Sequence, residues 1–169
     1  MPLRHGRAGG GAFMALLALI LLAAPSACRE AEMTHDRIDV QAPGPDGLPG
    51  IFWIIKQEDM AALAAWLDAG GDIEASGYHG ATPVLAAAVT DNWPAVLYLL
   101  ERGAHADVSD GRGFTLGHLA TVSRVDMSGP YGKALAQLRS LLADRGLLTR
   151  VYAPAEVRAL RADGRWPPR

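Results

Sequence analysis

The sequence predicts an all-α protein in which pairs of short helices stack on one another. Half of its 169 residues are hydrophobic, 7% are aromatic and 20% are charged. Alanine and leucine dominate, which suits closely packed helices better than a β-sandwich. Helix boundary signals recur along the chain, and the stretch 66–72 recurs at 99–105. At this length we expect one folded domain behind the N-terminal segment.

The segment 1–27 has the pattern of a signal peptide. Arg4, His5 and Arg7 give a positively charged start, and an uncharged, apolar run follows over 12–24. Such a run is too short to cross about 30 Å of hydrocarbon but fits the apolar core of an export signal. The sequence therefore predicts a signal peptide over 1–27, with a transmembrane anchor as the alternative.

Cys28 is the only cysteine, so no disulfide can form within the chain. Together with the small residues Ser26 and Ala27 it resembles the lipobox of bacterial lipoproteins, which implies a lipidated Cys28 at a new N-terminus. Pro25 departs from that pattern, where an aliphatic residue is usual, and cleavage near Ala27 with a free thiol is the alternative. Arg29 is not the Asp that often retains such proteins at the inner membrane, which favours the outer membrane, facing the periplasm.

The segment 28–47 is predicted to be a tether. Charged residues dominate its first half, and a Pro-Gly-Pro-Asp-Gly run occupies 43–47. Such a composition cannot bury a core, and its prolines favour an extended chain. We expect it to hold the folded part away from the membrane.

The repeat is clearest in the middle of the chain. The segment 66–72 aligns with 99–105 at an offset of 33. In the middle copy, Thr82 and Pro83 have the residue types of a helix cap and first helical position. Gly103 follows the second helix, where a left-handed backbone is favoured.

Two further copies flank the middle one. The third begins at 113–120, and its second helix is predicted over 134–144, which leaves an extra segment at 122–132. The first copy is degenerate, with apolar residues at 51–55 and a helix over 59–67, as expected of a capping repeat. A short final helix is predicted at 155–161.

These elements resemble ankyrin repeats, with their G-x-T-P-L-H-x-A-A, V-x-x-L-L and G-A signatures. Leu85 stands where the family has His, whereas the third copy keeps the family's His as His118 but has Leu116 in place of Pro. The resemblance implies an ankyrin-repeat solenoid of about three repeats over 48–150, built from helix pairs and β-hairpin fingers. A C-terminal capping segment, 151–169, would follow. An unrelated array of helical hairpins is the alternative.

The net charge of −2 hides a strong asymmetry. Segment 29–110 holds 14 acidic and 4 basic residues, whereas 111–169 holds 4 acidic and 10 basic ones. Such a field steers and orients a charged partner. The acidic half would repel phosphate, and the basic half has no nucleic-acid motif, so we do not expect a nucleic-acid binder. Variation of surface charge without function is the alternative.

Signals for catalysis are missing from the sequence. None of the five histidines lies three or four residues from another, and there is no G-x-S-x-G, H-E-x-x-H or C-x-x-C. We therefore expect no enzyme, catalytic residue, metal site or cofactor. His118 is expected to bond to neighbouring backbone and Thr groups, as its ankyrin counterparts do. Trp53, Trp66 and Trp93 are expected in the core, and Phe114 beneath its finger.

A protein-binding surface is what the resemblance implies instead. In ankyrin repeats, partners lie against the finger tips and the exposed faces of the first helices. The predicted contact residues are Tyr78, His79, Asp110 and Arg112 at the tips and Arg124, Asp126 and Tyr131 in the extra segment. The first helices would offer Lys56, Gln57, Val89, Thr90, Val122 and Ser123. A specificity role and a tolerated insertion are both open for 122–132.

Two hypotheses for the partner follow. A small ankyrin lipoprotein of the cell envelope resembles immunity proteins that neutralise type VI secretion toxins, including phospholipases. The alternative is an accessory scaffold for a resident protein, similar to periplasmic ankyrin proteins of peroxide defence or envelope assembly. In both cases another protein is the partner, and the membrane is contacted through the lipid anchor.

Overall fold

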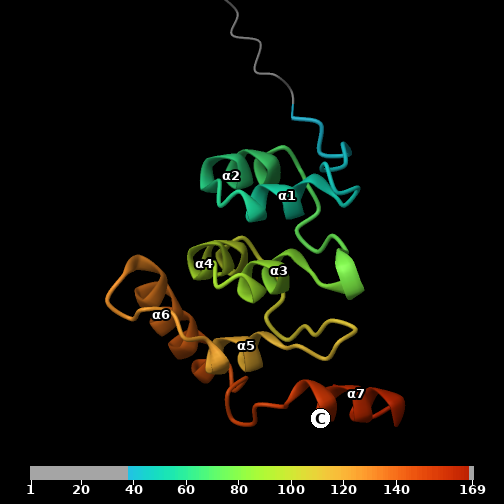
Figure 1. Ribbon diagram of the computed structural model, residues 1–169, viewed down its shortest axis with the longest axis vertical. Coiled ribbons are helices and arrows are strands. Elements are labelled where there is room, and N and C mark those ends of the chain that lie inside the picture. Colours follow the sequence, from blue (N-terminus) through green and yellow to red (C-terminus); the bar gives the residue numbers. More distant parts are fainter. Residues whose placement is uncertain (1–37, 168–169) are drawn as a thin grey trace, which may run out of the picture. The chain divides into compact units, whose positions relative to one another are not determined.

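The computed structural model describes residues 38–167, and within them the prediction of an all-α protein is confirmed: they form seven α-helices and no strand (Figure 1). The predicted signal peptide and Cys28 lie outside these residues. The helices are α1 Gly50–Lys56, α2 Met60–Asp68, α3 Pro83–Val89, α4 Trp93–Glu101, α5 Leu116–Val122, α6 Pro130–Asp144 and α7 Pro154–Ala162, with a 3-10 turn, η1, at Tyr78–Gly80. None of these helices has both the length and the hydropathy needed to cross a membrane.

The first six helices pack as three successive pairs. α1 packs on α2, α3 on α4 and α5 on α6, while α1 also contacts α3, and α3 contacts α5. We call these pairs layer 1, layer 2 and layer 3; they follow one another down the view of Figure 1. The most extensive contact is that between α4 and α6, so layers 2 and 3 share the largest interface.

The layers repeat the same dimensions. The first helices α1, α3 and α5 have seven residues each. They begin at Gly50, Pro83 and Leu116, so each start follows the previous one at an offset of 33. The second helices α2 and α4 have nine residues each and begin at Met60 and Trp93, which keeps the same offset. The interval seen in the sequence is therefore also the interval of the backbone.

The helix starts use several kinds of cap. The side chains of Asp59 and Asn92 accept hydrogen bonds from the N–H groups three residues later, at 2.9 and 3.2 Å. Thr115 accepts one from the His118 N–H at 3.1 Å. Thr82 takes the predicted position before Pro83, but its Oγ1 is buried without a hydrogen-bond partner. At α2, α4 and α5 the side-chain cap thus satisfies an otherwise free helix N–H.

The connections between the paired helices turn at matching positions. Glu58 and Asp91 have positive φ angles of 56° and 57°, and they occupy equivalent positions in layers 1 and 2. Gly70 and Gly103 lie two residues beyond the ends of the second helices, and their φ angles are 87° and 100°. This left-handed backbone suits glycine at a helix end, as the sequence predicts for Gly103.

Each layer is preceded by a tight turn, which we call finger 1 (43–49), finger 2 (76–82) and finger 3 (109–115). One backbone hydrogen bond closes each of them. The bonds run from Gly44 N to Leu48 O (2.7 Å), from Gly77 N to Ala81 O (2.9 Å) and from Asp110 N to Phe114 O (3.1 Å). In place of the expected β-hairpins, fingers 1 and 3 contain one isolated β-bridge each, Pro43–Pro49 and Ser109–Thr115.

Finger 1 lies in the segment that the sequence predicts to be a tether. Val40 and Leu48 pack against the core. A Cβ on Gly44 would lie 3.0 Å from the Trp53 Cβ, so the backbone of finger 1 sits directly on α1. The predicted start of the folded part at 48 is therefore too late, because the apolar contacts from Val40 onward and one turn are enough to fold the segment onto α1.

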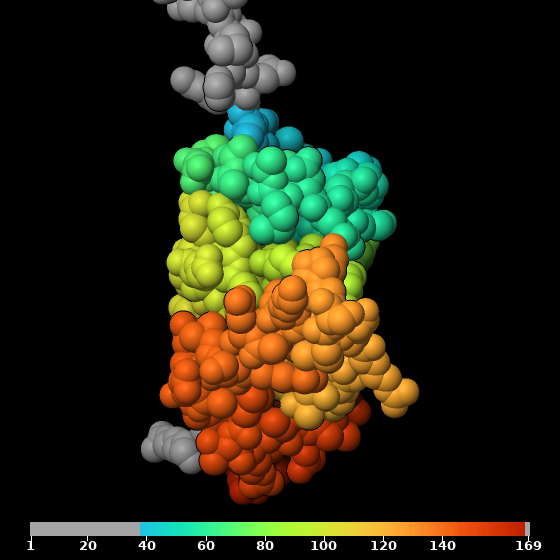
Figure 2. Space-filling model, turned by 90° about the vertical axis from the view of Figure 1, so that its left-hand side faces the viewer, coloured from blue at the N-terminus to red at the C-terminus, as the bar shows by residue number. Residues whose placement is uncertain are grey.

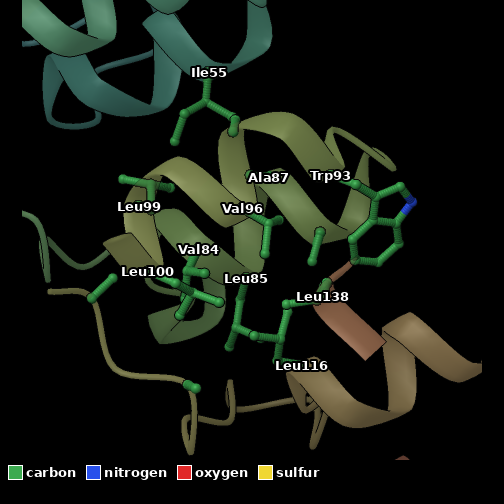
Figure 3. Packing of buried hydrophobic residues seen from close by; sticks show 14 of the residues in the cluster. Ile55, Val84, Leu85, Ala87, Trp93, Val96, Leu99, Leu100, Leu116 and Leu138 are labelled. Atoms are coloured by element: carbon green, nitrogen blue, oxygen red, sulfur yellow. The ribbon is translucent and has the colours of Figure 1, made fainter. Parts of the chain in front are cut away.

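The core is continuous through the layers. Figure 3 shows Leu85 of α3, Leu116 of α5 and Leu138 of α6 close together, with Ile55 of α1 on the side of layer 1. Small Ala87 and Ala88, both buried, contribute to the same core.

The three tryptophans behave differently from one another. Trp66 and Trp93 are buried, which confirms the prediction for both. Trp53 is half-buried, and the Lys56 Nζ lies 5.1 Å from the centre of its ring. Trp53 therefore covers the edge of layer 1 and does not enter the core fully.

The helix α6 is longer than predicted. It begins at Pro130, ahead of the expected start at Ala134, because proline fits the first turn of a helix. Its 15 residues compare with nine in α2 and α4. Part of the extra segment 122–132 is therefore helical, and the connecting loop shortens to 123–129.

Helix α7 covers finger 3, close to where the final helix is predicted. Arg161 donates to the carbonyl oxygens of Ser109 and Asp110 at 2.8 and 2.7 Å. Arg158 donates to the Arg112 carbonyl at 2.6 Å. The Arg112 carbonyl is the equivalent of the His79 carbonyl, which accepts from Gly111 of finger 3, so Arg158 bonds where a further finger would.

Replacing Leu138 by Ala tests the shared core. The side chain is fully buried, so we expect a loss of about 2–5 kcal/mol in the free energy of unfolding. The measurement is urea unfolding followed by circular dichroism at the helical band. Leu141→Ala in the same helix is the control, because Leu141 is only half-buried; equal losses for both variants would contradict this packing.

Candidate binding groove

A groove of about 470 Å³ lies between the fingers and the first helices of layers 1 and 2. Its apolar lining comes from Leu48, Phe52, Ile55, Ala81, Ala86 and Val89. Its polar and aromatic lining comes from Asp46, Lys56, Tyr78, His79, Thr90 and Arg112. A mostly apolar floor with a few polar groups around it suits a partner that buries an apolar side chain there.

Tyr78 and His79 lie together at the tip of finger 2, as predicted. Tyr78 is 63% exposed, the highest value for a large hydrophobic residue within 38–167. His79 has a φ of 57°, and its carbonyl oxygen accepts a hydrogen bond from the Gly111 N–H at 2.7 Å. This bond ties fingers 2 and 3 together and holds the tip of finger 2 in place.

Asp110 does not fit the prediction of an exposed contact residue. Its side chain is 1% exposed. One carboxylate oxygen accepts from the Arg112 and Phe114 N–H groups at 3.0 and 2.9 Å, and the other pairs with the Arg112 Nε at 2.8 Å. An aspartate that accepts bonds from the residues after it stabilises a turn. Asp110 therefore braces finger 3 from within.

Arg112 stays on the edge of the groove. Its side chain is 40% exposed, and its guanidinium lies 5.0 Å from the centre of the Phe114 ring. Together with the Asp110 ion pair, this contact fixes its orientation. Arg112 thus presents a polar surface to the groove, although its charge is largely balanced by Asp110.

Phe114 and His118 pack on each other below finger 3. Their rings lie 5.9 Å apart between centres, and both residues are half-buried. The hydrogen bond at His118 comes from its backbone N–H to the Thr115 Oγ1, whereas the expectation was a bond from the ring. The ring's contact with Phe114 is the interaction that the structure provides.

The loop 123–129 is held by bonds within the chain. Ser123 Oγ donates to Asp91 Oδ1 at 2.7 Å. Both carboxylate oxygens of Asp126 accept from Ser128, at 3.0 Å from the N–H and 2.8 Å from Oγ. These bonds lower the pKa of Asp126 from its ordinary value. Asp126 is exposed, and each of its carboxylate oxygens accepts one hydrogen bond within its own loop.

Tyr131 is also engaged. Its hydroxyl donates to Glu58 Oε2 at 2.5 Å, and this hydrogen bond, with partial burial, raises the pKa of Tyr131. Arg124 and Met127 are the exposed members of the loop whose side chains make no hydrogen bond within the described residues. Of the residues predicted here, Arg124 is thus the one best placed for an outside partner.

The predicted contact residues therefore form two groups. Tyr78, His79 and Arg112 line the groove next to the fingers, at the N-terminal side of the first helices. Arg124, Asp126 and Tyr131 follow the C-terminal end of α5 and do not line it. The predicted residues are not one continuous site.

The sequence interpretation missed the part of the groove that comes from finger 1. Asp46 and Leu48 line the groove but lie in or beside the predicted tether. A signal was present: G-x-x-G occurs at 44–47 and 77–80, and D-x-x-G at 110–113, which is the spacing of the repeat. Extending the alignment of the repeats toward the N-terminus would have placed finger 1 in the fold.

A second cavity of about 410 Å³ lies between 106–108, just ahead of finger 3, and the segments before and after α7. Its aromatic lining is Tyr152 and Trp166, which meet edge to face at 5.5 Å. Across 38–167 no group of three or more His, Cys, Asp and Glu side chains is arranged to hold a metal ion. The groove remains the larger and more apolar of the two spaces.

Comparison with protein-family models and with curated proteins finds no match for this sequence.

Asp110→Ala tests the internal role of this carboxylate. The change removes the acceptor of three hydrogen bonds in a buried position, so we expect a loss of about 1–3 kcal/mol in the free energy of unfolding. Asp110→Asn keeps one acceptor oxygen and should lose less. Thermal unfolding of the three proteins measures the order, and an unchanged stability for Asp110→Ala would contradict the bracing role.

Proposed function

We propose that this protein is an ankyrin-like repeat module whose groove binds another protein. The observation that carries the proposal is an open, mostly apolar groove built from successive fingers and first helices that recur at one regular interval. The proposal assigns the chain a binding role without catalysis.

The repeat assignment has support from three backbone features that share the interval. The starts of the first helices, the turns at Glu58 and Asp91, and the finger glycines all recur at an offset of 33. The finger glycines are Gly47, Gly80 and Gly113, with φ angles of 77°, 69° and 87°. An unrelated array of helical hairpins has no physical reason to keep all three features in register. We therefore favour an ankyrin-like solenoid over that alternative.

Exposed apolar side chains in the groove support its role as a binding surface. Tyr78 on one side and Val89 on the other are 63% and 46% exposed. Burying such side chains contributes roughly 25 cal/mol per Å² of apolar area. Tyrosine is also a frequent anchor of protein interfaces, because it buries a large area and still forms a hydrogen bond.

The charges of the folded residues support a protein partner with a preferred orientation. Residues 38–110 carry 11 acidic and 2 basic side chains, whereas 111–167 carry 4 acidic and 9 basic ones. A partner with the opposite arrangement would be steered and aligned before it made contact. The exposed Arg124 belongs to the basic part.

For the partner itself we propose an incoming secreted toxin, such as a phospholipase of a type VI secretion system. The protein would act as its immunity protein from the periplasm, anchored at the outer membrane through a lipidated Cys28. Neutralisation would occur by covering the toxin's active site or its membrane-docking face. A resident envelope or stress-defence protein is the second candidate, with the chain as its scaffold.

The experiment that tests this function is a pull-down with the tagged full-length chain, followed by calorimetric titration of any stoichiometric partner. A single secreted toxin, bound at nanomolar affinity and inhibited on binding, is the result expected of an immunity protein. A weaker complex with a resident envelope protein would replace the immunity role by the scaffold role. An enzymatic activity of the isolated chain would contradict both.

Val89→Gln tests whether the groove is the contact surface. A polar amide would be buried against the partner without a designed acceptor, so we expect the dissociation constant to rise about tenfold. Val122→Gln is a matched control, because Val122 is the same residue at the equivalent position of α5, is 52% exposed and does not line the groove. An equal rise of the dissociation constant in both variants would show that the groove is not the contact surface.

Arg124→Glu tests electrostatic steering. Reversing an exposed charge in the basic part should slow association several-fold at low salt and much less at about 0.15 M salt, where the screening length is about 8 Å. Stopped-flow association at several salt concentrations measures the effect. An association rate that does not change at low salt would remove Arg124 from the proposed surface.

A further inference from the structure

Tyr131 makes a contact that skips a layer. It lies in the first turn of α6, in layer 3, and its hydroxyl donates to Glu58 in the turn between α1 and α2, in layer 1. The two oxygens are 2.5 Å apart, and 73 residues separate the partners in the sequence. Helix packing elsewhere in the stack connects each first helix with its neighbours in the adjoining layers.

A second contact places the same loop on the intermediate layer. Ser123 Oγ donates to Asp91 Oδ1 at 2.7 Å. Asp91 is the equivalent of Glu58 one repeat later, and both residues have the left-handed backbone of the turn. Layer 3 therefore holds the same turn position in each of the two preceding layers. Figure 2 shows the start of α6, in orange, extending along the yellow-green second layer toward the first.

The segment around Tyr131 is fixed by its own packing. A Cβ on Gly132 would lie 2.3 Å from both the Asp126 carbonyl oxygen and the Met127 Cα, so the loop backbone rests directly on α6. Further along the helix, Arg139 donates twice to the Ala120 carbonyl at the end of α5, at 2.9 and 2.7 Å. Because this framework is already ordered, the bond to Glu58 costs little additional side-chain entropy.

A contact across two layers changes how a stack opens. In a linear array each repeat touches only its neighbours, so terminal repeats can open locally while the others stay folded. Layer 1 is the N-terminal member of this stack and is therefore one of the layers that can open in this way. Because layer 3 is bonded to the α1–α2 turn, layer 1 cannot open without also breaking a hydrogen bond to layer 3.

We infer that Tyr131 is a positioning residue that locks layer 1 to layer 3 through Glu58. The lock makes the three layers open together, and it keeps Phe52 and Ile55 of α1 at a fixed distance from finger 2. The consequence for the groove rests on the proposed binding function, whereas the lock itself does not. Tyr131 thereby acts inside the chain and not as the partner contact expected from the sequence.

The test is hydrogen–deuterium exchange of the full-length chain, read by mass spectrometry for peptides from each layer. Tyr131→Phe removes the hydroxyl and keeps the ring. We expect exchange of the α1 and α2 amides to become about fivefold faster, which corresponds to a typical net hydrogen bond of about 1 kcal/mol. The α5 amides should change by less than about twofold.

Ser123→Ala is the matched control in the same loop. It removes the tie to Asp91, so it should accelerate exchange around the α3–α4 turn and leave α1 and α2 unchanged. The lock would be overturned if Tyr131→Phe accelerated α1 and α2 no more than Ser123→Ala does, or if it accelerated all three layers equally.

Two variants of Glu58 separate the bond from general damage to the turn. Glu58→Gln keeps an acceptor for the Tyr131 hydroxyl and should retain most of the protection of α1 and α2. Glu58→Ala should match Tyr131→Phe, and combining the two should add little, because both remove one shared interaction. Additive effects in the double variant would overturn the lock. None of these readouts needs a partner, so normal locking with no binding would count against the proposed function alone.

Discussion

Helices as short as the first helix of each layer cannot persist alone in water, since isolated helices below about 12–15 residues are marginal even with favourable sequences. The first helices α1, α3 and α5 have seven residues each, so each one depends on contact with the layers beside it. This dependence explains why the buried side chains form one continuous cluster and why Leu85, Leu116 and Leu138 come from three different helices. It also explains why the spacing of the turns matters more than the strength of any single cap.

Because each layer depends on its neighbours, the two terminal layers need something else to cover their outer sides. The two ends are covered in different ways. Layer 1 is covered by finger 1, whose Leu48 packs on the core and whose Gly44 lies against Trp53. Layer 3 is covered by α7, where Arg158 and Arg161 bond to backbone carbonyls of finger 3. One end is closed by a finger of the same length as the other two, and the other by charged side chains that can also remain partly hydrated.

The sequence predicted the helix pairs well because their signals are local: a cap or proline at the start, a glycine at the end and a regular spacing between copies. The failures concern interactions between distant segments. Within 40–47 the spacing of the glycines is the one signal that this segment belongs to the fold, and no apolar pattern there indicates that Val40 packs on the core. Nothing near Asp110 indicates that its carboxylate is covered once finger 3 turns. The exposed Tyr78 and the groove beside it could be inferred from position, but the finger 1 lining of that groove required the first repeat to be aligned completely.

The extra segment 122–132 shows most clearly that the position of a side chain along the stack decides its role. An inserted loop with Arg, Asp and Tyr has the composition of a binding loop. Here its last residues extend α6 by about one turn, roughly 6 Å at about 1.5 Å per residue, while packed helices lie about 8–10 Å apart. That extension plus the length of a tyrosine side chain carries the Tyr131 hydroxyl past layer 2 to Glu58. A shorter α6 would leave the same tyrosine free in solvent. The difference between a partner contact and an internal lock is thus set by one helical turn, which begins at Pro130 and lies outside the helix expected over 134–144.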